Sequence, residues 1–216
     1  MRGFSWVKPM FRREEKPFFL PTEVEALINS CRFRMSVFLQ TLKETGADSG
    51  EAWLILWTDL NIAENTVALT PTKNHNARTL PISEHLISRL TLLPRKSLYV
   101  FRGKDLDDFR KGFWEVKKRI AKKLQNERFN RVEYRSFRHW KATNEYRKTK
   151  DILHVKWLLG HKRIENTLVY THLVPLGKSQ FVCRVAHTLE EATVLIEEGF
   201  EFVTEMDGVK LFRKPK

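Results

Sequence analysis

Cysteine is scarce in this 216-residue chain: it contains only Cys31 and Cys183, and neither has a Cys-x-x-Cys partner. This excludes a disulfide framework and a thiolate zinc site, and it suits a reducing, cytoplasmic compartment. Long apolar runs are also missing, since no uncharged stretch approaches the roughly 18 residues of a membrane span. The first 16 residues hold no apolar core of a secretory signal. We therefore expect neither an integral membrane protein nor a membrane partner.

Acidic residues are outnumbered, with 26 Asp and Glu against 39 Lys and Arg, which gives a net charge of +13. Residues 110–150 alone carry 15 basic and four acidic side chains, interspersed with aromatic residues. Such a segment can both fold and face a polyanion. A solvated helix face or a membrane-surface helix would have similar charge, but nucleic acid is the favoured partner. The candidate contacts are Lys117, Lys118, Lys122 and Lys141.

Hydrophobic periodicity predicts a polar segment over residues 1–16, followed by a mostly helical region. The first helix should open at Thr22, where Thr22 and Glu25 have the spacing of a capping box. Further helices are predicted over residues 34–44, 49–57, 83–92, 106–124, 136–148, 151–159 and 164–172. Alternation with period 2 predicts strands over 66–70 and 77–82, joined by a polar stretch, and a strand-like run over 97–101.

The predicted helix over 106–124 has an apolar stripe formed by Phe109, Phe113, Val116, Ile120 and Leu124, with its lysines on other faces.

The chain changes character after residue 172. A strand is expected over 181–186, a helix with acidic residues over 188–198, and a hairpin over 200–213 that turns at Asp207-Gly208. The predicted fold class is mainly α with a small β-hairpin (α+β), plus a C-terminal β-α-β-β appendage. The expected domains are the N-terminal segment 1–16, a catalytic-type domain over 17–172 and a tail over 173–216.

Four motifs occur in a fixed order along the chain: Thr-Gly-Ala-Asp-Ser-Gly-Glu-Ala at 45–52, Arg-Ser-Phe-Arg-His at 135–139, Leu-Leu-Gly-His at 158–161 and Tyr-Thr-His at 170–172. In this order they resemble the catalytic domain of tyrosine recombinases, the phage-type integrases, and most closely their archaeal members. The resemblance covers about residues 20–172.

The resemblance implies a specific chemistry. A tyrosine hydroxyl attacks a DNA phosphodiester and leaves a 3′-phosphotyrosyl link, so bond energy is conserved and no ATP, metal or other cofactor is required. The transition state carries extra negative charge, which arginine forks stabilise. The leaving 5′ oxygen needs a proton donor, and the tyrosine must lose its proton.

By resemblance, Tyr170 is the nucleophile and Arg138 clamps the scissile phosphate. Arg135 takes the histidine position of the family's His-x-x-Arg pair, where it can donate to phosphate but cannot act as a base. His161 would hydrogen-bond the phosphate, and Lys73, in the predicted hairpin, would be the general acid. Each of these also has an ordinary interpretation as a core or solvated residue.

Asp48 stands where the family pattern has its first catalytic arginine, while Glu51 keeps the family's acidic position. Loss of one preorganised donor costs about 10²–10³ in rate, and an added anion beside phosphate makes this worse. Asp48 and Glu51 are also spaced to cap the next helix. We therefore expect strongly impaired cleavage unless another cation fills the gap.

A second departure is the N-terminal helical domain that family members use to close around DNA, for which about 16 residues leave no room. The chain would then be a separate domain, a gene fragment from an integrated mobile element, or a protein that needs a partner. Recombination in the family involves four protomers on two duplexes, so self-association on double-stranded DNA is expected. The tail would dock on a neighbouring protomer or on its own chain.

Three other functions fit parts of the sequence. One is a DNA-binding relative that has lost cleavage, in keeping with Asp48. A basic RNA-binding or ribosome-associated protein would explain the charge but not the ordered motifs. A relative of type IB topoisomerases would share the chemistry, but it is not expected to carry the Leu-Gly-His box.

Overall fold

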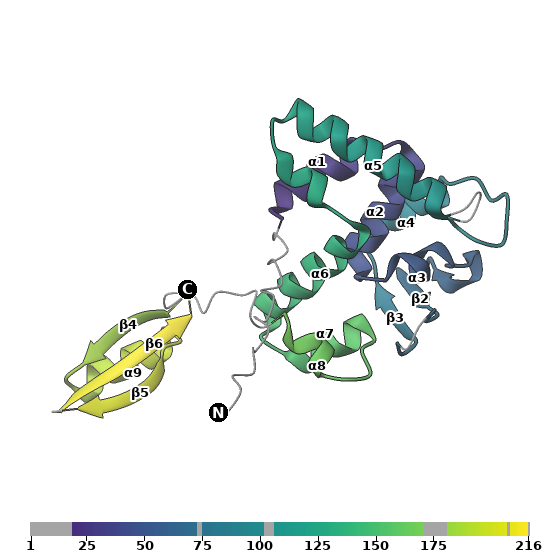
Figure 1. Cartoon of the computed structure of the whole chain (residues 1–216). Coiled ribbons are helices and arrows are strands. Elements are labelled where there is room, and N and C mark those ends of the chain that lie inside the picture. The colour runs from purple at the N-terminus through teal and green to yellow at the C-terminus, as the bar shows by residue number, and fades with distance from the viewer. Residues whose placement is uncertain (1–18, 73–74, 102–105, 171–180, 207, 216) are drawn as a thin grey trace, which may run out of the picture. The chain divides into compact units, whose positions relative to one another are not determined.

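The computed structural model describes residues 19–72, 75–101, 106–170, 181–206 and 208–215. The chain forms two compact units, which meet in sequence between Leu173 and Val174 (Figure 1). The first is mainly helical with a small sheet, and the second is a three-stranded sheet with one helix. The predicted α+β class is confirmed. No helix in the described part of the chain is long and apolar enough to cross a membrane.

The first unit opens with three helices: α1 (Pro21–Asn29), α2 (Phe33–Thr45) and α3 (Ser49–Trp53). The Thr22 capping box is wrong, because Pro21 already occupies the first helical position. The cap is instead Glu23, whose carboxylate accepts a 2.8 Å hydrogen bond from the N–H of Leu20. Proline suits this position because the missing N–H would have no helical partner.

A three-stranded antiparallel sheet follows, with the order β1 (Leu60–Asn61), β2 (Thr66–Leu69), β3 (Arg78–Pro81). The β2–β3 hairpin confirms the two predicted strands, and β1 was missed because two residues are too few for a periodic pattern. Arg78 and Leu80 are buried, whereas Thr79 between them is exposed. The alternation therefore turns an arginine inward.

Helices complete the first unit: α4 (Glu84–Thr91), α5 (Leu106–Lys123), α6 (Tyr134–Thr149), α7 (Ile152–Leu159) and α8 (Glu165–Leu168), with 3₁₀ turns η1 (Trp57–Asp59) and η2 (Glu127–Arg131). The helix over 49–57 was predicted too long, since α3 ends at Trp53. The helix over 164–172 is also shorter, with residues 169–170 in a turn and 171–172 outside the described residues. The strand-like run at 97–101 contributes only an isolated bridge between Leu56 and Tyr99.

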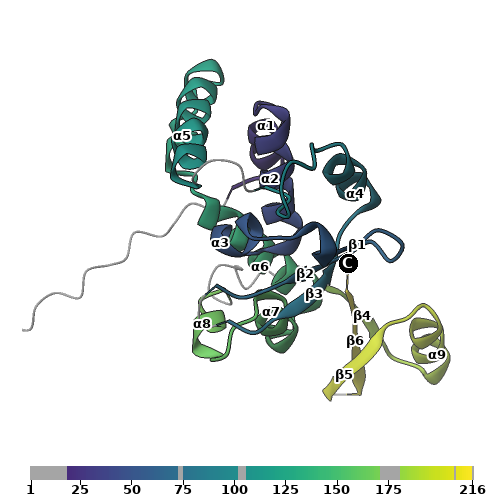
Figure 2. The same cartoon turned by 90° about the vertical axis from the view of Figure 1, so that its right-hand side faces the viewer.

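Aromatic rings form the centre of the core. Phe38 on α2 is fully buried and makes edge contacts with four rings at centroid distances of 5.1–5.9 Å, from Trp53, Phe101, Phe109 and Tyr134. These rings come from distant parts of the chain, so burying Phe38 fixes α2 against α5 and α6. In Figures 1 and 2, α2 lies among α1, α4, α5 and α6.

The apolar stripe of α5 is confirmed except at its end: Phe113 and Ile120 are buried, but Leu124 lies beyond the helix and is 49% exposed. Lys117 was expected on a polar face and is instead only 8% exposed. Its ammonium donates to the carbonyl oxygens of Val132 at 2.5 Å and Asn130 at 3.3 Å. Lys117 thus stabilises the end of the turn η2.

The second unit contains β4 (Phe181–Ala186), α9 (Leu189–Glu197), β5 (Glu201–Met206) and β6 (Val209–Pro215), with antiparallel order β4-β6-β5. The predicted β-α-β-β arrangement is confirmed. Its core contains only Ala186, Ala192, Leu195, Phe200 and Phe212 among the described residues. Of the predicted turn, Asp207 lies outside the described residues, and Gly208 has a φ of +75° that favours glycine.

Candidate active site

Tyr170 lies just after α8 and is only 3% exposed. Two imidazoles flank its ring: the ring centre of His139 is 5.4 Å away, and His161 stacks at 6.5 Å with planes 13° apart. Burial raises the pKa of the Tyr170 hydroxyl, while the charges of Arg138 and Arg135 oppose that rise. The tyrosine therefore keeps its proton at neutral pH and needs an acceptor to become a nucleophile.

Arg138 is buried on α6, and protein carbonyls already occupy part of its guanidinium. Its two terminal nitrogens donate to the carbonyl oxygens of Gly46 and Leu159, each at 2.7 Å. Burial lowers the pKa of Arg138 below its usual value, and the carboxylates of Glu51 and Asp48 oppose this shift. The side chain thus ties the ends of α2 and α7 to the site, with three of its five N–H donors left for other partners.

His161 follows the glycine that ends α7. Gly160 has a φ of +68°, and a Cβ there would lie 2.7 Å from both the Arg78 guanidinium and the Asn76 carbonyl oxygen, so only glycine fits. The Nδ1 atom of His161 lies 2.9 Å from the buried Thr167 hydroxyl. Burial, followed by the charges of Arg138, His75 and Arg78, lowers the pKa of His161 to about 4. The imidazole is therefore neutral near pH 7.

Arg135 is exposed on α6, in the turn of the helix that precedes Arg138. Residues three apart share a face of a helix, so Arg135 lies on the side of α6 that carries Arg138, and its charge opposes the rise in the Tyr170 pKa. The structure thus brings together four of the sequence-predicted residues: Tyr170, Arg138, His161 and Arg135. Lys73, the fifth, lies outside the described residues.

Asp48 caps α3 as predicted. Its carboxylate accepts from the N–H of Gly50 at 3.0 Å, and its own N–H donates to the Glu51 carboxylate at 3.0 Å. The capping box is therefore confirmed. An arginine in this position could not make the cap, whereas aspartate stabilises the start of the helix.

Glu51 is the centre of a buried network that the sequence reasoning missed. Arg78 donates to its carboxylate at 2.8 Å and to the carbonyl oxygen of Leu158 at 2.7 Å. The Nδ1 atom of His75 lies 2.7 Å from the same carboxylate. Burial by itself would raise the pKa of Glu51, but the hydrogen bonds and charge of Arg78 and the hydrogen bond of His75 bring it below its usual value. Glu51 is consequently ionised at neutral pH.

The network joins the β2–β3 connection to the end of α7. Asn76 donates its N–H to the carbonyl oxygen of Gly160 at 2.8 Å, and the ring centres of His75 and His161 are 5.8 Å apart. In Figure 2 the β2–β3 hairpin extends toward α7 and α8. One signal for Arg78 was available in the sequence, because it shares the inward parity of Leu80 and Ile82 in the predicted strand.

Charges within the site largely cancel. Arg78 is paired with Glu51, and the Asp48 carboxylate is near enough to raise the pKa of Arg138. The cation that remains toward solvent among the described site residues is Arg135. The cancellation makes this a weaker anion pocket than one with arginine at position 48.

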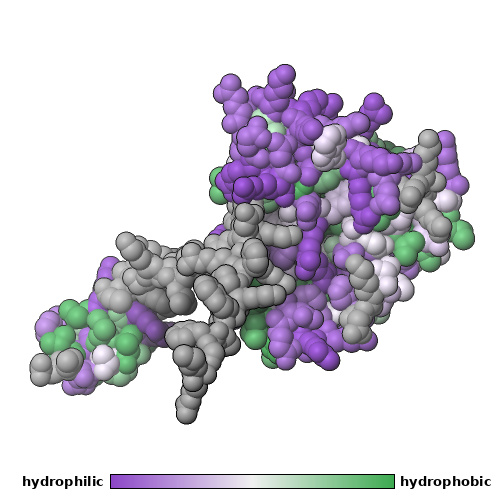
Figure 3. Space-filling view, in the orientation of Figure 1, coloured by the Kyte–Doolittle hydropathy of each residue, from purple (hydrophilic) through white to green (hydrophobic). Residues whose placement is uncertain are grey.

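The four predicted DNA-contacting lysines differ in their exposure. Lys117 is removed from the set because its ammonium is buried on backbone carbonyls. Lys118 is exposed over the Trp114 ring at 3.7 Å, and Lys122 is also exposed. Lys141 is half-buried and pairs with Glu145 at 2.9 Å. Figure 3 shows the hydrophilic surface over α5.

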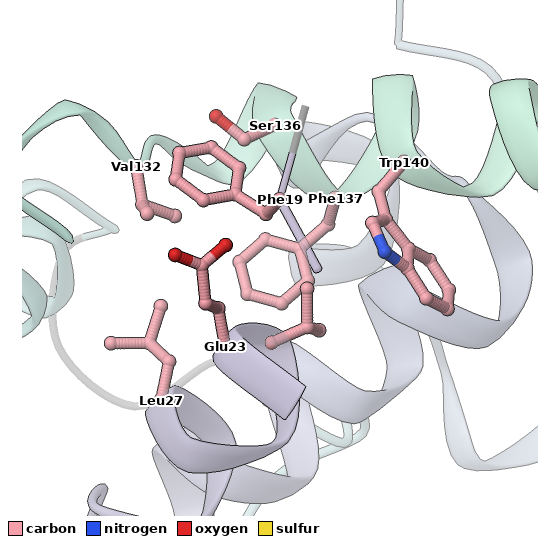
Figure 4. A pocket seen from close by; sticks show the side chains of 8 residues that line it. Phe19, Glu23, Leu27, Val132, Ser136, Phe137 and Trp140 are labelled. Carbon is pink, nitrogen blue, oxygen red and sulfur yellow. The ribbon is translucent and has the colours of Figure 1, made fainter. Parts of the chain in front are cut away.

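A separate apolar pocket lies between the start of α1 and α6 (Figure 4). Phe19, Leu27, Phe137 and Trp140 line it, with the carboxylate of Glu23 at one side. It shares α6 with the site but contains none of the predicted site residues. The pocket is therefore distinct from the tyrosine-centred site.

Comparison with known proteins finds sequences and structures that are similar to this chain. The tyrosine recombinase XerA of Saccharolobus solfataricus is 27% identical over 175 residues, which cover 77% of this chain and 55% of XerA. A crystal structure of XerA recombinase superposes with a TM-score of 0.62 at 21% identity, covering 74% of this chain and 61% of that one. XerH recombinase bound to its difH substrate gives a TM-score of 0.55 at 22% identity, covering 72% and 50%.

The chain spans about half the length of the curated relatives it matches. The sequence model of the phage integrase family matches residues 17–175. That match includes the buried tyrosine, Arg135 and Arg138 of α6, and the Gly-His pair. The chain therefore belongs to the phage integrase family.

Proposed function

We propose that this chain is the catalytic part of a site-specific DNA recombinase that cleaves and rejoins double-stranded DNA through a 3′-phosphotyrosyl intermediate. The observation that carries this proposal is the position of Tyr170, a buried phenol bordered by His139 and His161 and acted on by the charges of Arg138 and Arg135. A nucleophile that attacks a phosphodiester needs an acceptor for its proton and donors for the developing charge, and these imidazoles and guanidiniums can supply both.

The proposed roles follow from exposure and hydrogen bonding. Arg135, which is exposed, would contact the scissile phosphate directly. Arg138 would offer the donors that are not bound to Gly46 and Leu159. His161 would donate from Nε2, in the neutral tautomer whose Nδ1 accepts from the Thr167 hydroxyl. Lys73 remains the proposed general acid for the leaving 5′ oxygen.

Duplex DNA is the proposed partner because exposed cations gather on α5 and α6 and a similar fold has been solved with DNA. Affinity for a generic duplex should fall steeply between 50 and 200 mM salt, by roughly 10³ or more for six or more phosphate contacts. Fluorescence anisotropy measures the affinity for the duplex, and single-stranded RNA of equal length is the comparison ligand. A flat salt response or a preference for RNA would contradict this part of the proposal.

A second candidate function is DNA binding with impaired cleavage. The observation that favours it is the capping role of Asp48, which holds a carboxylate where the family pattern has an arginine donor. In this case duplex binding persists while covalent chemistry is slow or absent. The two functions share a surface and differ only in the reaction of Tyr170.

A trapping experiment separates the two functions and does not require a defined target sequence. The full chain is incubated with a pool of duplexes that carry a nick inside a randomised segment, so that the released fragment diffuses away after cleavage. Adducts that survive denaturation are recovered and sequenced. We expect an adduct that Tyr170→Phe abolishes and that Tyr146→Phe, the matched control, retains.

Binding without any adduct, also from Asp48→Arg, would support the second function and overturn the first. An adduct that persists in Tyr170→Phe would overturn the assignment of the nucleophile. We further propose that the protein acts in the cytoplasm and self-associates on DNA. The expected result is a larger sedimenting species only when the recovered duplex is present.

A further inference from the structure

α6 carries a third residue at the tyrosine. His139 is half-buried, and its ring centre lies 5.4 Å from that of Tyr170, closer than the 6.5 Å of His161. It directly follows Arg138 and lies one helical turn after Arg135. Residues four apart share a face of a helix, so positions 135 and 139 are directed to the same side.

The buried phenol of Tyr170 needs a nearby base. It is 3% exposed, so little solvent reaches it to take its proton. Burial also raises its pKa, which makes spontaneous ionisation rare at neutral pH. A positioned side chain that takes the proton during attack contributes about 10²–10⁴ in rate.

The other groups at the site are poorly suited to this task. Arg135 stands at the family's histidine position, but a guanidinium has no acceptor. Protonation of His161 is opposed by burial and by Arg138, and its Nδ1 already faces Thr167. The Asp48 carboxylate accepts the capping hydrogen bond of α3.

We propose that His139 is the proton acceptor for Tyr170, displaced by one helical turn from the histidine position of the family pattern. The role rests on the proposed strand-cleavage function. The O–H proton of Tyr170 passes to a ring nitrogen of His139 while the phenol oxygen forms its bond to phosphorus. The bond from phosphorus to the 5′ oxygen breaks, and that oxygen leaves with a proton from the general acid. Rejoining reverses each transfer.

The test uses the duplex recovered from the randomised pool, with the full chain and, in parallel, its Asp48→Arg variant. His139→Ala and His139→Gln should slow adduct formation by about 10²–10⁴. Replacing Tyr170 by a fluorinated tyrosine, whose phenol is more acidic, should shrink that defect to less than about tenfold, because an acidic nucleophile depends less on a base. His154→Ala, a surface histidine of α7, is the matched control and should keep the parent rate.

A second substrate distinguishes the two ends of the reaction. In a duplex with sulfur in place of the bridging 5′ oxygen, the leaving thiolate needs no proton donor. This substrate should therefore restore the cleavage rate of Lys73→Ala and leave the His139→Ala defect unchanged. This substrate separates the role of His139 from that of the general acid, while the fluorotyrosine rescue is the readout that a purely structural role of His139 would not produce.

The outcomes are distinct. Parent-like rates for both His139 variants, or a defect that fluorotyrosine does not reduce, would overturn the assignment of His139 while leaving the recombinase function intact. Absence of adduct from the parent and from Asp48→Arg would instead overturn the proposed strand cleavage, and this inference with it.

Discussion

The inner wall of the site (Glu51, Arg78 and Arg138) and its outer rim (Arg135 and His139) contain similar residue types with different partners. In the inner wall, arginines donate to backbone carbonyls and to a buried carboxylate. On the rim, Arg135 faces solvent and His139 lies against the ring of Tyr170. The same type of side chain thus holds helices together in the inner wall and faces solvent, where a phosphate could reach it, on the rim.

The comparison shows why the arginine position at 48 matters. Arg78 supplies the site with a cation, but Glu51 and two backbone carbonyls use its donors. It therefore does not replace a phosphate-facing arginine at position 48. The four experiments that follow test the contrast between wall and rim, from the largest expected effect to the smallest.

Removing the inner-wall cation should have the largest effect. Arg78→Met leaves the Glu51 carboxylate buried without its main partner, and breaking a buried pair in this way costs about 3–5 kcal/mol. The free energy of unfolding in urea measures it. Arg135→Met on the rim is the matched control and should change stability by less than about 0.5 kcal/mol.

A double variant sharpens this result. Glu51→Gln added to Arg78→Met removes the unpaired charge and should recover part of the lost stability. If Arg78→Met unfolds at the parent's urea concentration, the inner wall is not held by this pair.

Adding a cation to the rim should increase cleavage. Asp48→Arg should raise the rate of covalent adduct formation by about 10²–10³, because it adds a preorganised donor beside the phosphate. Asp48→Asn keeps the helix cap and only removes the anion, so its gain should be smaller. An unchanged rate in Asp48→Arg would mean that position 48 does not limit the reaction.

His161 should make the stability of the first unit sensitive to mild acid. The unfolded imidazole binds a proton below its ordinary pKa of 6.5, whereas the folded one does so only near 4. The unfolded state therefore binds more protons in this window, and stability falls as pH decreases, by up to about 1.4 kcal/mol per pH unit.

Urea unfolding between pH 7 and pH 4 measures this slope. His161→Asn should reduce it, whereas the surface variant His154→Asn should keep most of it. Equal slopes in all three proteins would contradict the buried, neutral state of His161.

The lysines of α5 show the same contrast between structural and solvent-facing cations, and here we expect the smallest effect. Lys118→Ala and Lys122→Ala should each lower the salt dependence of duplex binding by about one unit of slope, at unchanged stability. Lys117→Met should alter stability and leave the slope unchanged, because its ammonium bonds to the carbonyls of Asn130 and Val132. The reverse pattern would mean that Lys117, not its neighbours, contacts DNA.

Local rules predicted much of this molecule. The cap at Asp48 was predicted because it involves residues three apart, and the hairpin of β5 and β6 because a Gly turn separates two alternating runs. The start of α1 was misplaced because Thr22 and Glu25 have the spacing of a capping box. The cap in the structure is instead the hydrogen bond from the backbone N–H of Leu20 to the Glu23 carboxylate.

The site was predicted only in part, for a related reason. Motif order led to Tyr170, Arg138, Arg135 and His161, which the fold brings together. It did not lead to Arg78, whose partners lie 27 and 80 positions away in the chain. Nor did it separate Lys117 from Lys118, since a helix pattern does not say where the chain returns to offer carbonyl oxygens.

The sequence by itself determined most of the helices, the hairpins and the family, and it predicted the candidate site residues, because these depend on neighbours within a few residues or on motifs in fixed order. Only the tertiary structure decided which cations face inward and which face solvent. A guanidinium or ammonium becomes structural when distant carbonyls and carboxylates surround it, and those partners are brought close only by packing.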